Sequence, residues 1–405
     1  MLCFIPLLFL FASPAGDEDL RPLDTVAIAG SKSKLEGRVV RVAPEEIVVR
    51  VKSKLESVPR GTVAEYTSVN ENLMSLMDQL AAAPNAENTE GLQPLAESCE
   101  TLGLRGEARL VWWSILRLEP TNEEANKALG NRKVKKKWQT RMGTRWKDVA
   151  DLFAEKPKWG DAYELQTTHF NIKSGLPWGE TVRGALLAEE MYVDLYRSFA
   201  GDFGLYWSSE ICDLIFYAGE GFEGGGEVRA LTDVDARRVS LDFAAGIELW
   251  LMGRYVSELL IYQAVREMGG GRASLPMWVT IGMSETMLAH LGVHDGIKTR
   301  IHYDPGRTYS DHKSMHAAAE DPYEFTRILN FGAGDFRRSE HMLQRAEAYT
   351  LFNYCWKEYP TKFQMYFNMA LEGKGSSTDF KGAMEIKNGR AEDEFQAAWI
   401  AWVKQ

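Results

Sequence analysis

The spacing of the hydrophobic residues changes along the chain and divides it into regions of different secondary structure. Residues 24–66 alternate apolar and polar side chains, with Gly30, Gly37, Pro44 and Gly61 marking turns. An alternation of period two predicts β-strands. We therefore expect a small antiparallel β module here.

Residues 70–155 follow a helical period instead. One stretch resembles a tetratricopeptide helix pair, carried by Ala108, Trp112, Ile115, Pro120, Leu129 and Gly130. Only one such repeat is convincing, and stacked repeats are normally needed to bury their faces. The alternative is an ordinary α-hairpin that packs on its neighbour.

Residues 156–405 predict a larger domain. Strand patterns at 163–176 and 204–219 flank an amphipathic helical pattern at 180–201, and the chain from Phe243 onward reads as almost wholly helical. Because strands precede helices rather than alternating with them, the predicted fold class is α+β.

The segment 132–147, RKVKKKWQTRMGTRWK, is strongly basic and carries Trp138 and Trp146. Such a segment could line an anionic groove or meet a membrane surface. Because the chain as a whole is acidic, we favour a solvated connecting segment whose two tryptophans pack inward.

The net charge of −10 and the pI near 5.4 argue against nucleic acid as a main partner, since phosphate binding needs a broad basic surface. The apolar run at residues 2–15 ends with Ser13 and Ala15 at the −3 and −1 positions of a cleavage site, which predicts a signal peptide over residues 1–15. A mis-annotated start or a buried N-terminal strand is the alternative. We expect an exported protein, periplasmic, envelope-associated or extracellular, with no transmembrane anchor.

Two motifs carry a further resemblance: SELLI at 257–261 and PMWVTIG at 276–282. They resemble the H-E-x-x-H and P-x-W-x-x-E-G motifs of secreted zinc-peptidase-like domains of the gluzincin type, and the resemblance covers about residues 155–405. It implies a fold with an N-terminal sheet and a helical half, and zinc ligands at the positions of Ser257, Ile261 and Ile281. The outer two of these are 281 − 257 = 24 residues apart.

All three implied ligand positions have lost their donors, because isoleucine has no lone pair and a neutral serine hydroxyl binds zinc poorly. Without zinc to activate a water molecule, Glu258 would be a vestigial base, a carboxylate satisfied by a neighbouring Tyr, Arg or backbone donor. We therefore expect no zinc, no other cofactor and no catalysis. The old cleft, with Trp278, Gly282 and Glu285 as candidate lining residues, could bind a peptide, a protein or a cell-wall ligand. An active metal-dependent hydrolase with an unusual site is the alternative function.

The remaining motifs carry weaker signals. The pairs His290/His294 and His312/His316 have metal-ligand spacing, but surface histidines are the favoured interpretation, and His169 is expected to be structural. GEGFEG at 219–224 matches a dinucleotide-binding pattern but is not followed by a helix start, so a flexible loop is expected. The scattered Cys99, Cys212 and Cys355 suggest buried small hydrophobes, although a disulfide could form in an oxidising compartment.

Overall fold

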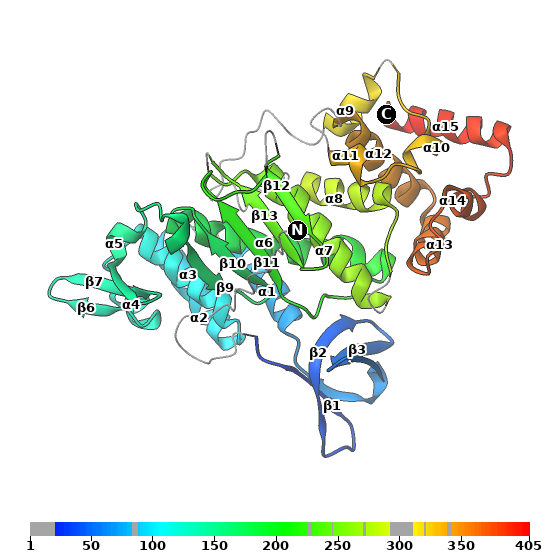
Figure 1. Ribbon diagram of the computed structural model, residues 1–405. Helices are drawn as coiled ribbons and strands as arrows, with labels where there is room; N and C mark the ends of the chain where they lie inside the picture. Colours follow the sequence, from blue (N-terminus) through cyan, green and yellow to red (C-terminus); the bar gives the residue numbers. More distant parts are fainter. Residues whose placement is uncertain are drawn as a thin grey trace, which may run out of the picture.

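The computed structural model describes residues 21–82, 88–224, 228–244, 246–269, 273–291, 311–319, 321–337 and 342–405. Figure 1 shows the β module at the bottom, the first helices and a second sheet above it, and the C-terminal helices at the upper right. Sheets and helices coexist in the α+β arrangement that the sequence predicts. The predicted signal peptide at 1–15 lies outside the described residues.

The β module is a five-stranded antiparallel sheet, which confirms the prediction for residues 24–66. Its strands are β1 (Asp24–Ile28), β2 (Lys34–Val42), β3 (Glu46–Val51), β4 (Lys54–Pro59) and β5 (Val63–Tyr66). The strand order is β4-β3-β2-β1-β5, so the last strand, which follows a short 3-10 turn at Arg60–Thr62, returns to pair with the first. The Asp24 carboxylate accepts hydrogen bonds from the backbone N–H groups of Val39 and Val69, both at 2.7 Å, and so fixes the exit from the module.

Four helices follow: α1 (Val69–Ala82), α2 (Thr89–Thr101), α3 (Arg105–Leu118) and α4 (Glu123–Ala128). Helix α3 packs against the large domain rather than against further repeats. A Cβ atom on Gly106 would lie 2.9 Å from Thr167 Cα, and the Trp113 and Trp178 rings are 5.1 Å apart. This packing favours the α-hairpin interpretation over a tetratricopeptide array.

Residues 132–148 form a three-stranded antiparallel sheet and not the connecting segment that we expected. The strands are β6 (Arg132–Val134), β7 (Lys137–Met142) and β8 (Arg145–Asp148), followed by a short helix, α5 (Val149–Leu152). The reversals occur at Lys135 (φ 56°) and Gly143 (φ 58°), which adopt the left-handed conformation of tight hairpin turns. Trp138 is 9% exposed, as expected, but Trp146 is 40% exposed and does not pack inward.

The large domain begins with a five-stranded mixed sheet of order β12-β13-β11-β10-β9. Its strands are β9 (Tyr163–Gln166), β10 (Phe170–Ser174), β11 (Cys212–Tyr217), β12 (Ala230–Asp233) and β13 (Arg238–Asp242), and a 3-10 turn at Trp159–Asp161 precedes them. The three central strands are parallel and both edge strands are antiparallel. The predicted strand at 204–209 does not form; there the chain passes the β module, and Trp207 N–H donates to Val40 O at 2.7 Å.

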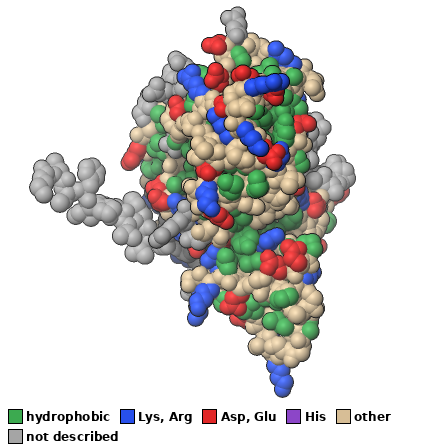
Figure 2. Space-filling view, turned by 90° about the vertical axis from the view of Figure 1, so that its right-hand side faces the viewer, with side chains coloured by type: hydrophobic (Ala, Val, Ile, Leu, Met, Phe, Trp, Pro, Cys, Tyr) green, Lys and Arg blue, Asp and Glu red, His purple; other side chains and the backbone are tan. Residues whose placement is uncertain are grey.

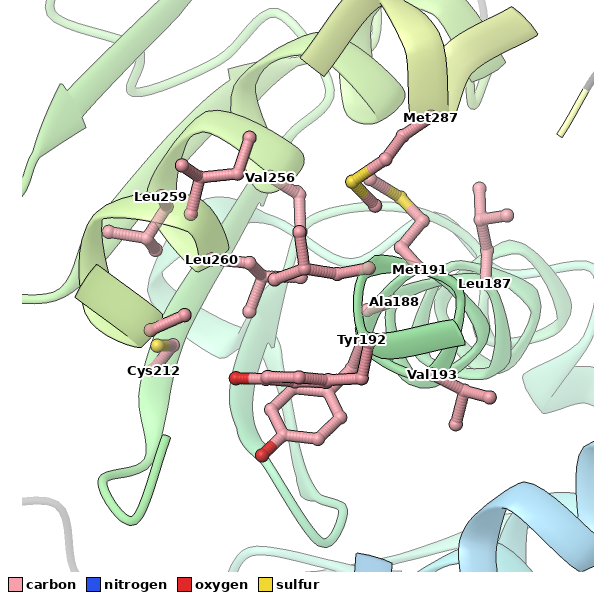
Figure 3. Close-up of a cluster of buried hydrophobic side chains, with 14 of the residues drawn as sticks. Leu187, Ala188, Met191, Tyr192, Val193, Cys212, Val256, Leu259, Leu260 and Met287 are labelled. Carbon is pink, nitrogen blue, oxygen red and sulfur yellow. The ribbon is translucent and has the colours of Figure 1, made fainter. Parts of the chain in front are cut away.

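One face of this sheet is covered by α6 (Trp178–Phe203) and α7 (Leu249–Met268). Helix α6 extends beyond its predicted end and stops at Gly204, which has φ 64°. Figure 3 shows how side chains of α6, including Met191, meet Leu260 of α7, Met287 of α8 and Cys212 of the sheet.

The rest of the domain is helical: α8 (Met277–Leu291), α9 (Asp311–Ala317), α10 (Phe325–Ile328), α11 (Ala333–Arg337), α12 (Met342–Glu358), α13 (Pro360–Leu371), α14 (Ser377–Ala383) and α15 (Gly389–Val403). Figure 2 shows acidic and basic side chains interspersed over the face that these helices present. Cys99, Cys212 and Cys355 are free thiols in the core, as expected. Among the described helices, none combines the length and hydropathy needed to cross a bilayer.

Candidate functional site

Helices α7 and α8 bring Ser257, Ile261 and Ile281, the positions that the resemblance implies as zinc ligands, to one interface. The hydroxyl oxygens of Ser257 on α7 and Ser284 on α8 are 2.7 Å apart. One turn away, a Cβ atom on Gly253 would lie 2.4 Å from Leu288 Cδ1. Residue numbers thus rise on α7 as they fall on α8, which makes the pair antiparallel.

This register extends naturally by one further turn. Ile261 is four residues beyond Ser257, and Ile281 is three residues before Ser284, so helical periodicity places both on the facing surfaces. Both isoleucines are 1% exposed. The Ser257 hydroxyl donates to a carbonyl of its own helix, at Gly253 or Arg254, and shares its contact with Ser284. The three positions therefore present apolar packing and a satisfied hydroxyl.

Glu258 is buried, with 8% exposure, and pairs with a distant arginine. Arg345 Nη2, on α12, donates to Glu258 Oε1 at 2.8 Å. The carboxylate therefore has the arginine partner that the sequence analysis offered as one option. Because a guanidinium stays charged at all accessible pH values, it provides Glu258 with a buried ion-pair partner.

Glu285 is the centre of the same network. It is fully buried and accepts hydrogen bonds from Arg254 Nε at 2.9 Å, from Arg345 Nε, and from His312 Nε2 at 3.0 Å. Burial by itself would raise the pKa of Glu285, but the attraction of Arg254 and Arg345 outweighs it and holds that pKa well below the usual range. Burial lowers the pKa of Arg345, and the two carboxylates reverse this effect and raise it.

We refer to Arg254, Glu258, Glu285, His312 and Arg345 as the arginine cluster. Its members come from α7, α8, α9 and α12, so it joins four helices by charge-assisted hydrogen bonds. Sequence reasoning missed both arginines. Arg254 opens the stretch RYVSELLIYQ, one turn before Glu258, and its position on the same helix face was the available signal.

His312 and His316 are not surface histidines, contrary to the sequence-based interpretation. Their exposures are 1% and 2%. His312 contacts Glu285, while His316 Nδ1 lies 2.8 Å from the Thr350 hydroxyl and its ring lies 4.5 Å from that of Trp399. Their polar flanking residues suggested exposure, but partners on distant helices bury them.

The candidate cleft residues lie inside the helical half. Trp278 is fully buried, with its ring 5.6 Å from that of Phe380 and 5.9 Å from that of Phe363. A Cβ atom on Gly282 would lie 2.3 Å from Phe352 Cβ, so the glycine permits close contact between α8 and α12. A ligand could reach Trp278, Gly282 or Glu285 only after these helices separate.

The other sequence motifs take no part in this site. His290 lies at the end of α8, where the side chain is outside the described residues, as is the whole of His294. Gly219 and Gly221 have φ values of 88° and 84° in a loop that leads to β12, which agrees with the loop interpretation. Within the described ranges, no group of three His, Cys, Asp or Glu side chains is arranged to hold a metal ion.

A second buried cluster surrounds His169, and we refer to it as the histidine cluster: Asn70, Glu107, Thr168, His169 and Glu189. Glu107, on α3, accepts hydrogen bonds from the backbone N–H and the hydroxyl of Thr168, both at 2.9 Å. Glu189, on α6, accepts the backbone N–H of His169 at 2.7 Å, and its second oxygen lies 2.7 Å from His169 Nδ1. The Tyr192 ring stacks on the imidazole at 3.5 Å.

The hydrogen bonds determine where the protons of this cluster lie. Asn70 Nδ2 donates to Val39 O at 3.2 Å, so its Oδ1 is the atom that faces His169 Nε2 at 2.8 Å, and Nε2 must carry a proton. Burial raises the pKa of Glu189 to about 7 and lowers that of His169 well below its usual value. Both shifts favour the neutral forms of the two side chains, in which Glu189 carries the proton between them.

Burial also raises the pKa of Glu107 to about 7, with a further contribution from the nearby Glu189. The cluster lies where α1, α3, α6 and the turn before β10 meet. This arrangement agrees with the structural role expected for His169.

No family model, curated protein or solved structure gave a match to this chain.

Proposed function

We propose that this chain is a non-catalytic relative of the gluzincin-type zinc peptidases, and that it acts as a binding or structural module of an exported, envelope-associated protein. The observation that carries the proposal is the ion pair of Glu258 with Arg345. In this ion pair, Arg345 binds the carboxylate of the residue that the family resemblance implies as the catalytic base.

The residues at the implied ligand positions do not fit zinc. Catalytic zinc needs three strong protein ligands, and Ile261 and Ile281 offer no donor atom. Ser257 offers only a neutral hydroxyl that already bonds within the helix pair. A positively charged guanidinium beside Glu258 would in addition repel a cation bound at this interface.

The contacts of the arginine cluster suggest that a guanidinium group links the helices in place of a metal ion. In a metal site, a cation holds side chains of several helices together. Here the tethered cation of Arg345 contacts Glu258 on α7 and Glu285 on α8, and it belongs to α12. We infer that this guanidinium stabilises the helix core that zinc stabilises in active relatives.

Metal analysis is the first test. The purified full-length chain, supplied with zinc and then dialysed, should retain no stoichiometric zinc and should cleave no member of a broad peptide library above background. Zinc retained one to one, together with cleavage that Glu258→Gln abolishes, would establish the alternative of an active hydrolase.

Reversion of the ligand positions tests the family assignment itself. The triple variant Ser257→His, Ile261→His, Ile281→Glu should gain a zinc-dependent rise in its melting temperature, because the helix register brings these positions together. Adding Arg345→Met should strengthen the gain, since it removes the opposing charge. The control replaces the same three residues by Gln, which adds polar groups without strong ligands; a folded His/His/Glu variant that responds to zinc no better than this control would count heavily against the assignment.

A further inference from the structure

The sheet β6–β8 carries charge opposite to that of the rest of the chain. Segment 132–147 contains eight Lys and Arg residues and no Asp or Glu. Since the whole chain has a net charge of −10, the remainder carries −18. Figure 1 shows the β6–β7 hairpin projecting at the left edge of the molecule, beyond α4 and α5.

Strand register divides the side chains of this sheet between two faces. Trp138 and Thr140 are buried and point to the same side of β7. The opposite, outer face follows from the pairs Arg132↔Gln139, Gln139↔Asp148, Val134↔Lys137 and Arg141↔Trp146. Arg132, Val134, Lys137, Arg141 and Trp146 are all exposed, so the outer face is open to solvent.

Acidic neighbours neutralise only part of the positive charge. Three cations have carboxylate partners: Lys137 with Asp148 at 2.6 Å, Lys147 with Glu155 at 2.8 Å, and Arg145 with Asp161 at 3.7 Å. Asp148 also accepts a hydrogen bond from Gln139 at 2.9 Å, which holds this carboxylate in the sheet.

The other five cations have no carboxylate within 4 Å in the described part of the chain: Arg132, Lys133, Lys135, Lys136 and Arg141. Glu123 interacts electrostatically with Lys133, but its salt bridge is with Lys127 at 3.0 Å. The Arg132 guanidinium lies over the Trp146 ring at 3.8 Å, which orders it on the outer face. The turn residues Lys135 and Lys136 extend the positive charge to the tip.

We propose that the outer face of β6–β8 binds an acidic polysaccharide, a linear chain with repeated carboxylate or sulfate groups. Clusters of Lys and Arg are typical binding sites for such polyanions. A thin linear chain can follow a projecting sheet without approaching the acidic remainder of the molecule, whereas an extended anionic surface would meet that remainder as well.

The aromatic residues favour a polysaccharide over single-stranded nucleic acid. Binding of unpaired bases relies on aromatic rings that are open for stacking. Here Trp146 is already stacked with Arg132, and Trp138 is in the core. Recognition on this face therefore depends on charge and spacing rather than on stacked bases.

The test uses calorimetric titration of the full-length chain with heparin and with polygalacturonate at low salt, with neutral dextran as the blank and with DNA and poly-glutamate as anionic polymers of other classes. The variant Lys135→Asn/Lys136→Gln removes two turn cations, and Asn suits the left-handed turn position. The matched control is Lys52→Asn/Lys54→Gln, since Lys52 (φ 55°) occupies the equivalent two-residue turn between β3 and β4.

We expect both acidic chains to bind and dextran not to bind, with affinity that falls as salt rises. The β6–β7 variant should bind about tenfold more weakly, and the control should stay within about twofold of the wild type. Absence of binding to both polysaccharides, or equal weakening by the two variants, would overturn the proposal. Tighter binding of DNA or of poly-glutamate than of either polysaccharide would reject the ligand class.

Discussion

The arginine cluster and the histidine cluster contain similar residues, but the pKa of Glu285 in the first shifts in the opposite direction from those of Glu107 and Glu189 in the second. Each has two buried glutamates and a histidine. In the arginine cluster two guanidinium groups contact Glu285 and hold its pKa well below the usual range. In the histidine cluster, burial dominates and raises the pKa values of Glu107 and Glu189 to about 7.

The difference shows that burial alone does not decide the charge of a carboxylate. A fully buried glutamate stays ionised when a guanidinium donates to it, and it takes up a proton when only neutral donors surround it. The same substitution, Glu to Gln, should therefore have opposite consequences in the two clusters.

Removing one side of the arginine cluster should have the largest effect. Arg345→Met leaves Glu258 and Glu285 with too little positive charge in the core, and Glu285→Gln leaves Arg254 without its carboxylate partner and Arg345 with Glu258 alone. We expect each variant to lose about 3–5 kcal/mol of unfolding free energy at pH 7, measured by chemical denaturation. The double variant should lose less than the sum of the two; strictly additive losses would show that the two residues are not coupled.

Glu107→Gln should instead change how stability depends on pH. The folded-state pKa of Glu107, about 7, is above the ordinary glutamate value of 4.5, so the native state keeps a proton that the unfolded state releases. This contribution is present below pH 4.5 and is lost as pH rises through 7. As pH rises between these values, the unfolding free energy of the Gln variant should therefore increase by about 2 kcal/mol relative to that of the wild type.

The control for this experiment is Glu285 in the arginine cluster, whose pKa shifts in the opposite direction from that of Glu107. A depressed pKa makes Glu285 stabilising above its unfolded-state pKa, and that contribution is lost only as pH falls through the depressed value. The unfolding free energy of Glu285→Gln should therefore not increase relative to that of the wild type between pH 4.5 and 7. If both variants gained equally, the contrast between the clusters would be wrong.

Glu258→Gln should have the smallest effect. Glu258 accepts one hydrogen bond from Arg345, and Arg345 keeps Glu285 as a second partner when Glu258 is replaced. We expect a loss on the order of 1 kcal/mol in thermal or chemical unfolding and no change in peptide cleavage above background. A loss as large as that for Glu285→Gln would place Glu258 at the centre of the network instead.

Local pattern predicted the β module and the helical half, because each depends on residues close in sequence. The partners of the buried charges could not be predicted in this way. Arg345 is 87 residues from Glu258, and no spacing rule joins them. The sheet at 132–148 was missed because its many cations hide the alternation of Trp138 and Thr140, and His312 was misplaced because its partner is on another helix.

The histidine cluster also bears on how separable the predicted domains are. Asn70 adjoins the β module, Glu107 belongs to the helical hairpin, and His169 and Glu189 belong to the large domain. Cutting the chain near residue 66 or 155 would expose or orphan polar groups that are satisfied only across the junction. We therefore expect the three regions to unfold as one cooperative unit, with each part stabilised by contacts to the others.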